Sequence, residues 1–220
     1  MSTPVLNLTF HGIGEPPPAV GVDERDVWLS EADFLAALDA IRALPEATVS
    51  FDDGNASDLL IALPALRERG LGATFFVVAA RLGQPDYLSA EDLRTLRGEG
   101  MTIGLHGMHH QRWRGLSDDE LDEEISGARR RLEDAAGAPL DAAACPFGAY
   151  DRRVLGRLRQ AGFTAVFTSD GGWASRGAWL QARNTLRARD GAAAVATLAA
   201  DDGAAARSKH KLKTLAKRWR

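Results

Sequence analysis

The sequence predicts an α/β fold in which parallel strands close into an irregular barrel. Short apolar segments alternate with longer amphipathic segments about seven times along the 220 residues. Strands that alternate with helices pair in parallel through right-handed crossovers, which gives either a barrel or an open, doubly wound sheet. A complete eight-fold barrel usually needs about 250 residues, so a barrel with fewer units fits this length better.

The N-terminal half supplies three of the expected strands, over residues 5–10, 48–51 and 73–79. The third is almost entirely apolar, as in a strand buried on both faces. A helix is expected from Ser30, which can cap it, to residue 43. A second helix is expected over residues 58–69, with a kink or restart at Pro64 and an end at Gly70.

The C-terminal half continues the alternation with strands expected over residues 101–105, 142–145, 164–168 and 179–182. Ser89 begins one helix, and residues 151–160 form another. Between them, Ser117 starts a long helix that ends at Gly137. Its acidic first turns and later arginines suit the helix dipole.

Two parts of the chain are expected: a barrel over residues 1–188 and a C-terminal helical region over residues 189–220. The alanine-rich stretch around residues 188–206 is interpreted as a linker. The last fourteen residues carry seven Lys or Arg, with Leu212, Leu215 and Trp219 between them. This pattern is typical of a basic amphipathic helix on an anionic membrane surface. It is equally typical of a solvated terminal helix that packs its apolar residues on the body.

Composition excludes several classes of protein. The charge sum of 27 basic and 30 acidic residues is −3, so a nucleic acid is not expected as a partner. The single cysteine, Cys145, rules out an intrachain disulfide framework and a multi-cysteine zinc site. No apolar run approaches the ~18 residues of a membrane span, and the N-terminus lacks the pattern of a signal peptide. We therefore expect a cytoplasmic chain; its oligomeric state stays open.

Polar residues and a Pro-Phe-Gly turn collect at the points where the expected strands end. They follow six of the strands directly: His11, Asp52, Asp53, His106, Pro146, Phe147, Gly148, Asp170 and Arg183. The carboxyl ends of parallel strands share one rim, and active sites form there. We therefore expect these separate segments to meet in one pocket.

The first of these motifs is Asp52-Asp53-Gly54. Two adjacent acids that leave a strand point in different directions, so one carboxylate can bind a cation while the other acts on a water molecule. An Asp-Gly pair is also common in turns, so this motif alone does not establish a site.

The second motif is a cluster of three of the five histidines within residues 106–110. On a helical turn, His106 and His110 would share a face, and His109 is an alternative to His110. Two imidazoles and one carboxylate form a familiar zinc-binding set. A divalent ion lowers the pKa of its water towards ~7, and a neighbouring free carboxylate can accept the proton. The two motifs together predict hydrolysis of an amide or ester.

Four segments, in this order, resemble the polysaccharide deacetylase family. They are residues 48–54 (TVSFDDG), 73–77 (ATFFV), 104–110 (GLHGMHH) and 144–151 (ACPFGAYD). The resemblance covers roughly residues 5–185. It implies a distorted (β/α)7 barrel that removes acetyl groups from N-acetylated sugars with a divalent metal. Zinc is the expected metal, and nickel and cobalt are the alternatives.

Carried over position by position, Asp52 matches the family's catalytic base. Asp53, His106 and His110 match its metal ligands, which leaves His109 a supporting role.

The resemblance also implies the walls of a substrate groove. Pro146, Phe147 and Gly148 match the motif that forms one wall, where the Phe147 N–H would help to hold an oxyanion. Asp170 and Trp173 resemble late family positions that shape the other wall.

Three departures from the family pattern matter. The arginine that often orients the base is replaced by Ala144; Arg183, counted here with the substrate-binding residues, is the candidate to reach the base from another strand end. The Ser or Thr usual after the first metal-binding His is Gly107, so a hydrogen bond that orders the backbone is expected to be missing. The late Leu-x-His motif that supplies a general acid is not evident. We predict that His11 protonates the leaving amine, as a His after the first strand is found in one branch of the family.

Two other functions stay open. One is hydrolysis of another small amide or a cyclic ureide on the same scaffold, and the other is sugar binding with weak or no catalysis. The retained acids and histidines speak against the second. The expected substrate is a polysaccharide, an oligosaccharide or a lipid-linked precursor. The precursor suits a cytoplasmic chain at the inner membrane face, where a basic tail would be attracted.

Overall fold

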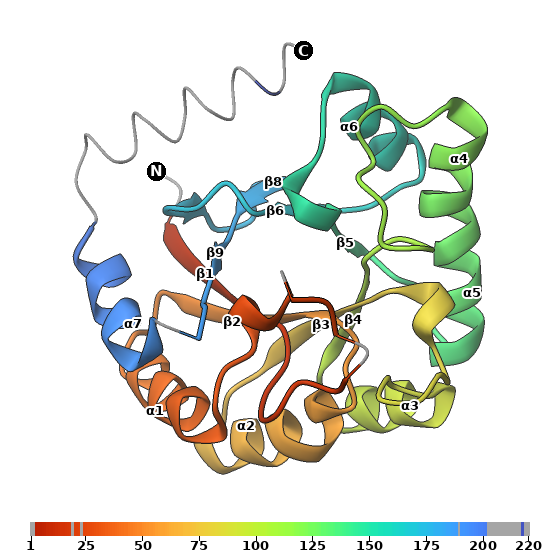
Figure 1. Cartoon of the computed structure of the whole chain (residues 1–220). Helices are drawn as coiled ribbons and strands as arrows, with labels where there is room; N and C mark the ends of the chain where they lie inside the picture. The colour runs from red at the N-terminus through yellow and green to blue at the C-terminus, as the bar shows by residue number, and fades with distance from the viewer. Residues whose placement is uncertain (1–2, 19, 23, 189, 202–216, 218–220) are drawn as a thin grey trace.

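The computed structural model describes residues 3–18, 20–22, 24–188, 190–201 and 217. Parallel strands form its centre and helices surround them (Figure 1). Seven strands make the parallel series: β1 (Pro4–Phe10), β2 (Ala47–Asp53), β3 (Ala73–Val77), β4 (Thr102–Leu105), β5 (Ala142–Ala144), β6 (Ala165–Thr168) and β8 (Leu180–Ala182). The predicted irregular barrel is confirmed.

Two very short strands that the sequence did not predict complete the sheet. β7 (Ala174–Ser175) pairs antiparallel with the start of β1, and β9 (Asn184–Thr185) pairs parallel with its end. Between them, the Asn7 side chain donates to the Ala182 carbonyl (2.9 Å) and to the Gln181 side chain (3.2 Å) of β8. The barrel therefore closes between β8 and β1 through side-chain hydrogen bonds rather than through a full ladder.

The helices begin and end where local signals predict. They are α1 (Glu31–Arg42), α2 (Leu63–Arg69), α3 (Ala90–Gly98), α4 (Asp118–Asp122), α5 (Ala128–Ala136), α6 (Arg152–Gln160) and α7 (Gly191–Ala200). Ser30 accepts from the Asp33 N–H, and Ser89 and Ser117 form capping boxes. Gly70 and Gly137 end their helices in the left-handed conformation.

Three helical predictions need correction. The helix expected over residues 58–69 starts as a π-helical turn, Asp58–Ala62, and becomes α-helical at Leu63 beside Pro64. The long helix after Ser117 is interrupted by a second π-helical turn, Glu123–Gly127. Much of the expected linker is helix α7, which packs against α1 and buries Val195. It buries apolar surface, which a linker would not.

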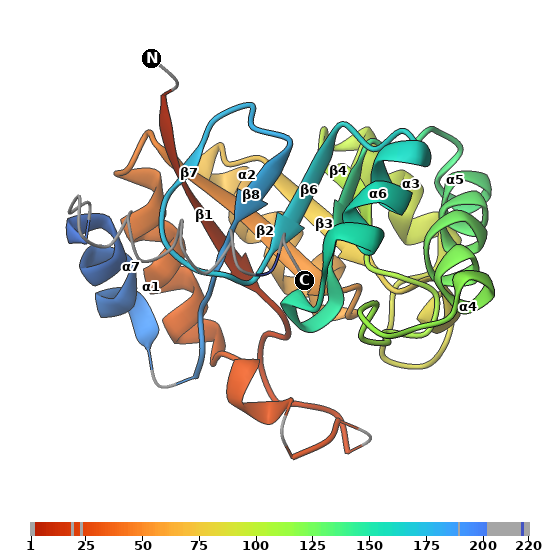
Figure 2. The same ribbon diagram turned by 90° about the horizontal axis from the view of Figure 1, so that it is seen from above.

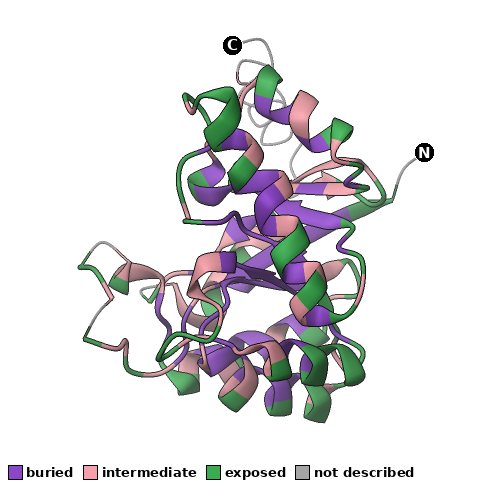
Figure 3. Ribbon diagram, turned by 90° about the vertical axis from the view of Figure 1, so that its right-hand side faces the viewer, coloured by how far each residue is buried: buried purple, intermediate pink, exposed green. Residues whose placement is uncertain are grey.

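The buried residues lie on the strands and on the inner faces of the helices (Figure 3). Phe51 of β2 stacks on Phe10 and Phe75 of the adjacent strands, at ring-centroid distances of 5.5 and 4.7 Å, and also meets Phe34 of α1. Side chains alternate along a strand, so anchoring Phe51 in the helix layer turns the next residue, Asp52, into the barrel.

No helix within the described ranges is long and apolar enough to cross a membrane. Of the basic tail, only Lys217 belongs to the described residues, so the predicted membrane contact lies outside them. The connection between β1 and α1 projects from the body of the molecule (Figure 2).

Candidate active site

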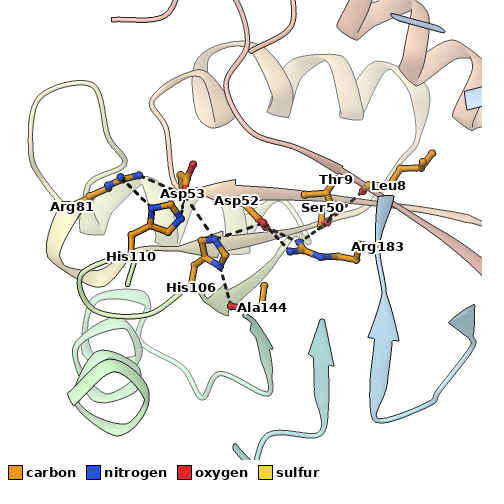
Figure 4. A network of polar contacts seen from close by, with 10 residues as sticks. All are labelled: Leu8, Thr9, Ser50, Asp52, Asp53, Arg81, His106, His110, Ala144 and Arg183. Atoms are coloured by element: carbon orange, nitrogen blue, oxygen red, sulfur yellow. Dashed lines mark hydrogen bonds and ion pairs between the residues drawn. The ribbon is translucent and has the colours of Figure 1, made fainter. Parts of the chain in front are cut away.

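Asp52 and Asp53 end β2, and their carboxylates point in different directions (Figure 4). The backbone of Asp53 has φ = 80°, in the left-handed region that Asp tolerates better than most residues. Gly54 follows with φ = 74°. This turn gives two neighbouring acids two separate environments, as the sequence predicted.

Asp52 forms a bidentate ion pair with Arg183, which lies between β8 and β9. Nη1 and Nη2 of Arg183 lie 2.6 and 2.8 Å from the two carboxylate oxygens, and Nη1 also donates to Ser50 Oγ at 3.1 Å. Burial alone would raise the pKa of Asp52, but the charge of Arg183 and the nearby His106 hold it well below its ordinary value. Asp52 is therefore ionised and fixed in orientation.

The side chain of Arg183 reaches Asp52, as expected from the sequence, and its place among the substrate-binding residues stays a prediction. Its side chain is 1% exposed and its terminal nitrogens are engaged by Asp52 and Ser50. Arg183 thus contacts Asp52 from the segment between β8 and β9, whereas the arginine that often orients the base in the family would stand at the position of Ala144.

Asp53, His106 and His110 offer ligand atoms that all lie within 4.8 Å of one another. Oδ1 of Asp53 is 3.2 Å from His110 Nε2 and 3.9 Å from His106 Nε2. This oxygen is buried and has no hydrogen-bond partner among the described residues. A buried carboxylate oxygen without a hydrogen-bond partner, facing two imidazoles, is a donor set that suits a divalent cation.

The tautomer of His106 is fixed for ligation. Its Nδ1 lies 3.0 Å from the Ala144 carbonyl oxygen, which can only accept, so Nδ1 carries the proton and Nε2 presents a lone pair to the cluster. Burial lowers the pKa of His106 to about 4, against the opposing effect of Asp52. Burial also lowers the pKa of His110. Both rings are therefore neutral near pH 7, as metal ligands must be.

The loop of residues 106–110 is not a helical turn, so the i,i+4 spacing is not what brings His106 and His110 together. Gly107 and His110 have φ values of 87° and 56°, so the backbone cannot continue as a helix. The loop itself brings His110 to Asp53, while His109, the alternative ligand, is exposed.

Two residues that the sequence reasoning missed contact this region. Glu124 is buried and accepts hydrogen bonds from the Met108 and His109 N–H groups. Its signal was present, because Leu121, Glu124 and Ile125 share one helix face and an acid among buried apolar residues is unusual.

Arg81 is the other missed residue. Its guanidinium lies 3.5 Å from Asp53 Oδ1, 3.5 Å from His110 Nδ1 and 3.9 Å from Glu24. It follows β3 by only four residues, so the rule that polar groups gather at strand ends also applies to it.

The Pro146–Gly148 segment forms one wall of the site. Phe147 adopts φ = 57°, and its ring lies 4.5 Å from the His110 ring and 4.5 Å from the Arg112 guanidinium. Phe147 is 48% exposed, whereas Pro146 and Gly148 are buried. The wall therefore presents an aromatic face beside the histidine cluster.

The late Asp and Trp positions behave differently from each other. Asp170 is buried and accepts from Tyr150 Oη (2.6 Å) and Thr168 Oγ1 (3.0 Å), and it also pairs with Lys217. A cleft of about 630 Å³, lined in part by Asp170, opens beside it towards α7. Trp173 is half-buried, and its Nε1 has no hydrogen-bond partner among the described residues.

His11 follows β1 and lies close enough to Asp52 and Asp53 to lower the pKa of both carboxyls. Its Nδ1 is buried without a hydrogen-bond partner in the described part of the chain. The Trp28 ring packs against Gly12, where an added Cβ would lie 2.0 Å from it. Only glycine fits at this position, and the close packing of the Trp28 ring holds the backbone just after His11.

The fold and the site thus define a barrel protein with a potential ion site and a second, arginine-held carboxylate at the carboxyl rim of its strands. The family model described as polysaccharide deacetylase matches residues 44–166, more than half of the chain. The chain belongs to the polysaccharide deacetylase family.

Individual relatives are distant in sequence. The chain is 24% identical to YxkH of Bacillus subtilis over 65% of its own length and 51% of YxkH. It is 29% identical to chitin deacetylase 1 of Cryptococcus neoformans over 54% of its length and 24% of that protein. The chain thus spans about half of the first relative and a quarter of the second.

Solved structures share the fold. The Streptococcus pyogenes deacetylase PplD, in complex with acetate, superposes with a TM-score of 0.78 and 18% identity over 90% of this chain and 99% of PplD. IcaB from Ammonifex degensii gives a TM-score of 0.74 and 21% identity, over 87% of this chain and 95% of IcaB.

Proposed function

We propose that this chain is a metal-dependent hydrolase that removes N-acetyl groups from an N-acetylated sugar, either in a polysaccharide or oligosaccharide or in a lipid-linked precursor. One observation carries the proposal: Asp53, His106 and His110 converge within 4.8 Å beside a second carboxylate, Asp52, that an arginine keeps ionised. Family membership and the acetate bound to PplD support it.

The proposed ligands of the ion are Asp53 Oδ1 and the Nε2 atoms of the two histidines. The donor set fits, because one carboxylate and two neutral imidazoles suit zinc, and also nickel or cobalt. Zinc is the metal we propose. A divalent ion supplies a Lewis acid for the acyl oxygen and lowers the pKa of water when it is bound.

The chain's own residues supply the proton transfers. Asp52 takes the proton of the attacking water, because it is ionised and lies next to the proposed ligands, with its Oδ2 3.7 Å from His106 Nε2. Arg183 keeps Asp52 ionised and aligned throughout. His11 donates a proton to the amine that leaves, and the Phe147 N–H stabilises the charge that develops on the acyl oxygen.

The sugar is proposed to lie along the wall formed by Phe147 and to extend towards the cleft beside Asp170. A volume of about 630 Å³ lies within the usual range of small-molecule sites. Aromatic faces such as Phe147 and Trp173 suit the apolar faces of sugar rings.

The decisive experiment measures acetate release from a panel of N-acetylated sugars, with Zn²⁺ and after treatment with a chelator. We expect acetate release that the chelator abolishes and that Zn²⁺ restores, with the Asp52→Asn variant inactive under all conditions. Release of ammonia or ring opening of a cyclic ureide, without acetate release, would assign the chain to the other amidohydrolase function. Sugar binding without turnover would assign it to the non-catalytic one.

A further inference from the structure

We propose that Glu124 is a positioning residue, which fixes the loop of residues 106–110 in the shape that brings His106 and His110 to one ion. The inference rests on the proposed function, since it concerns the same site. It identifies what replaces the hydrogen bond that Gly107 cannot make.

The Glu124 carboxylate accepts three hydrogen bonds, all from the loop and its continuation. Its donors are the His109 N–H (2.8 Å), the Met108 N–H (3.1 Å) and Trp113 Nε1 (3.1 Å). Glu124 is 2% exposed, so these bonds form away from bulk water. Charge-assisted hydrogen bonds of this kind are about twice as strong as neutral ones, and a buried carboxylate is costly without them.

Gly107 and Glu124 fit each other sterically. A Cβ at Gly107 would lie 2.5 Å from Glu124 Oε2 and 3.2 Å from Trp113 Nε1, and the φ of Gly107 is 87°. The space beside residue 107 is therefore filled by an acceptor from another element. A side chain at residue 107 would therefore meet the Glu124 carboxylate as it now lies.

The π-helical turn Glu123–Gly127 carries this carboxylate. Leu121, Ile125 and Ala128 of the same helix are buried in the core and anchor it. Single π-helical turns are rare in proteins, and many of those that occur lie at functional sites. Glu124 thus links a rigid, core-packed helix to a loop that has no regular secondary structure of its own.

The ion site depends on the loop because both imidazoles are attached to it. His106 is held by the Ala144 carbonyl, but His110, at the other end of the loop, lies against Asp53, Arg81 and Phe147 without a backbone carbonyl partner for its ring among the described residues. Loss of Glu124 would release the two N–H groups between them. Residues in outer shells typically contribute 10–100-fold to metal affinity.

The test compares Glu124→Gln and Glu124→Ala with Glu123→Gln, an exposed acid of the same turn. The first measurement is amide hydrogen exchange of residues 106–110 in the metal-free protein. The second is Zn²⁺ affinity by competition with a chelator. We expect faster exchange of the Met108 and His109 amides and about 10-fold weaker Zn²⁺ binding in Glu124→Gln, larger changes in Glu124→Ala, and no change in Glu123→Gln.

Gly107→Ala provides a second route if Glu124→Ala fails to fold. Its Cβ would lie 2.5 Å from Glu124 Oε2, and the φ of 87° also strains alanine, so it should speed exchange of the Met108 and His109 amides. The part of this effect that acts through the carboxylate should be smaller when Glu124 is already Gln. Wild-type exchange and wild-type Zn²⁺ affinity in Glu124→Gln would overturn the inference. If the wild-type chain bound no Zn²⁺, the proposed function would fail, while the exchange data would still decide whether Glu124 holds the loop.

Discussion

Asp52 and Asp53 are adjacent, buried and both shifted to a lower pKa, yet the protein treats them differently. Both oxygens of Asp52 accept hydrogen bonds from Arg183. Oδ1 of Asp53 has no hydrogen-bond partner among the described residues and faces two neutral imidazoles. The chain gives both oxygens of the first carboxylate hydrogen bonds, whereas Oδ1 of the second has only the Arg81 guanidinium at 3.5 Å and the two imidazoles around it.

This difference teaches how one turn can separate two roles. Alternation along β2 and the left-handed backbone of Asp53 send the two carboxylates towards different partners. Asp52 meets the Arg183 guanidinium at hydrogen-bond distance, while Asp53 meets two imidazoles, with Arg81 at 3.5 Å. In the proposed function the first environment keeps a carboxylate ionised as a base and the second holds a metal ligand.

The largest expected effect separates the two acids directly. Asp52→Asn should lower kcat for acetate release by about 1,000-fold, because it removes the base, and should leave Zn²⁺ uptake intact. Asp53→Asn should lose Zn²⁺ uptake and activity together. Activity assays with metal analysis after gel filtration measure both. Loss of Zn²⁺ in both variants alike would erase the distinction between the acids.

The next effect concerns the partner of the base. Arg183→Met leaves Asp52 buried and unpaired, which should lower the free energy of unfolding by about 3 kcal/mol. The pKa of Asp52 should then rise, so activity should recover partly at higher pH. Urea unfolding and a pH–rate profile measure the two quantities.

Arg187→Met is the matched control for Arg183. Arg187 lies four residues after Arg183, is half-exposed and pairs with Asp26. Its loss should therefore change the free energy of unfolding by less than about 1 kcal/mol. An Arg183 variant no more affected than this control would show that the guanidinium does not sustain the base.

In the metal-free protein, the contribution of the proposed ligand His106 to the free energy of unfolding should depend on pH. The pKa of His106 is about 4 in the folded chain and ordinarily 6.5, so only the unfolded chain binds this proton between those values. Its contribution to stability is complete above pH 6.5 and is lost as the pH falls towards 4, by about 3 kcal/mol. Urea unfolding with a chelator present measures the free energy of unfolding at each pH. His106→Gln should remove the part of its pH dependence between pH 6.5 and 4 that comes from this histidine. If the free energy of unfolding of that variant depended on pH as in the wild type, the lowered pKa of His106 would be contradicted.

The smallest effect tests His11, which lies near both acids and is proposed to act on the leaving amine. His11→Ala should lower kcat by about 100-fold, because it removes the proposed proton donor, with little change in Zn²⁺ affinity. The Nδ1 atom has no partner among the described residues, so the fold should tolerate the change. The exposed His109→Ala is the control. Near-normal turnover in His11→Ala would rule out the acid role.

Much of this could be predicted because strand ends and caps are local. The strands that carry Asp52, His106 and Asp170 follow from apolar periodicity, and the shared rim follows from parallel pairing. The meeting of Asp53 with His110 was predicted from the family resemblance, because residue type and spacing alone left His109 and His110 as alternatives.

The rest depends on tertiary geometry. The helical spacing of Leu121, Glu124 and Ile125 indicates that Glu124 is buried, but it does not indicate that the carboxylate reaches the loop of residues 106–110, because that contact is made from the π-helical turn Glu123–Gly127. The loop of residues 106–110 looked like a helical turn because the i,i+4 spacing is the same in both. β7 and β9 are two residues each, too short for any periodicity, and they exist because β1 needs a partner at its edge.

Arg183, which holds Asp52, stands between β8 and β9, next to the gap between β8 and β1 that Asn7 bridges with its side chain. Six consecutively paired strands do not need that segment to stay together. If β8 and β9 detach locally, the molecule keeps most of its secondary structure while Asp52 loses its counter-charge. On mild warming, the hydrolytic activity should therefore be lost at a lower temperature than the secondary structure.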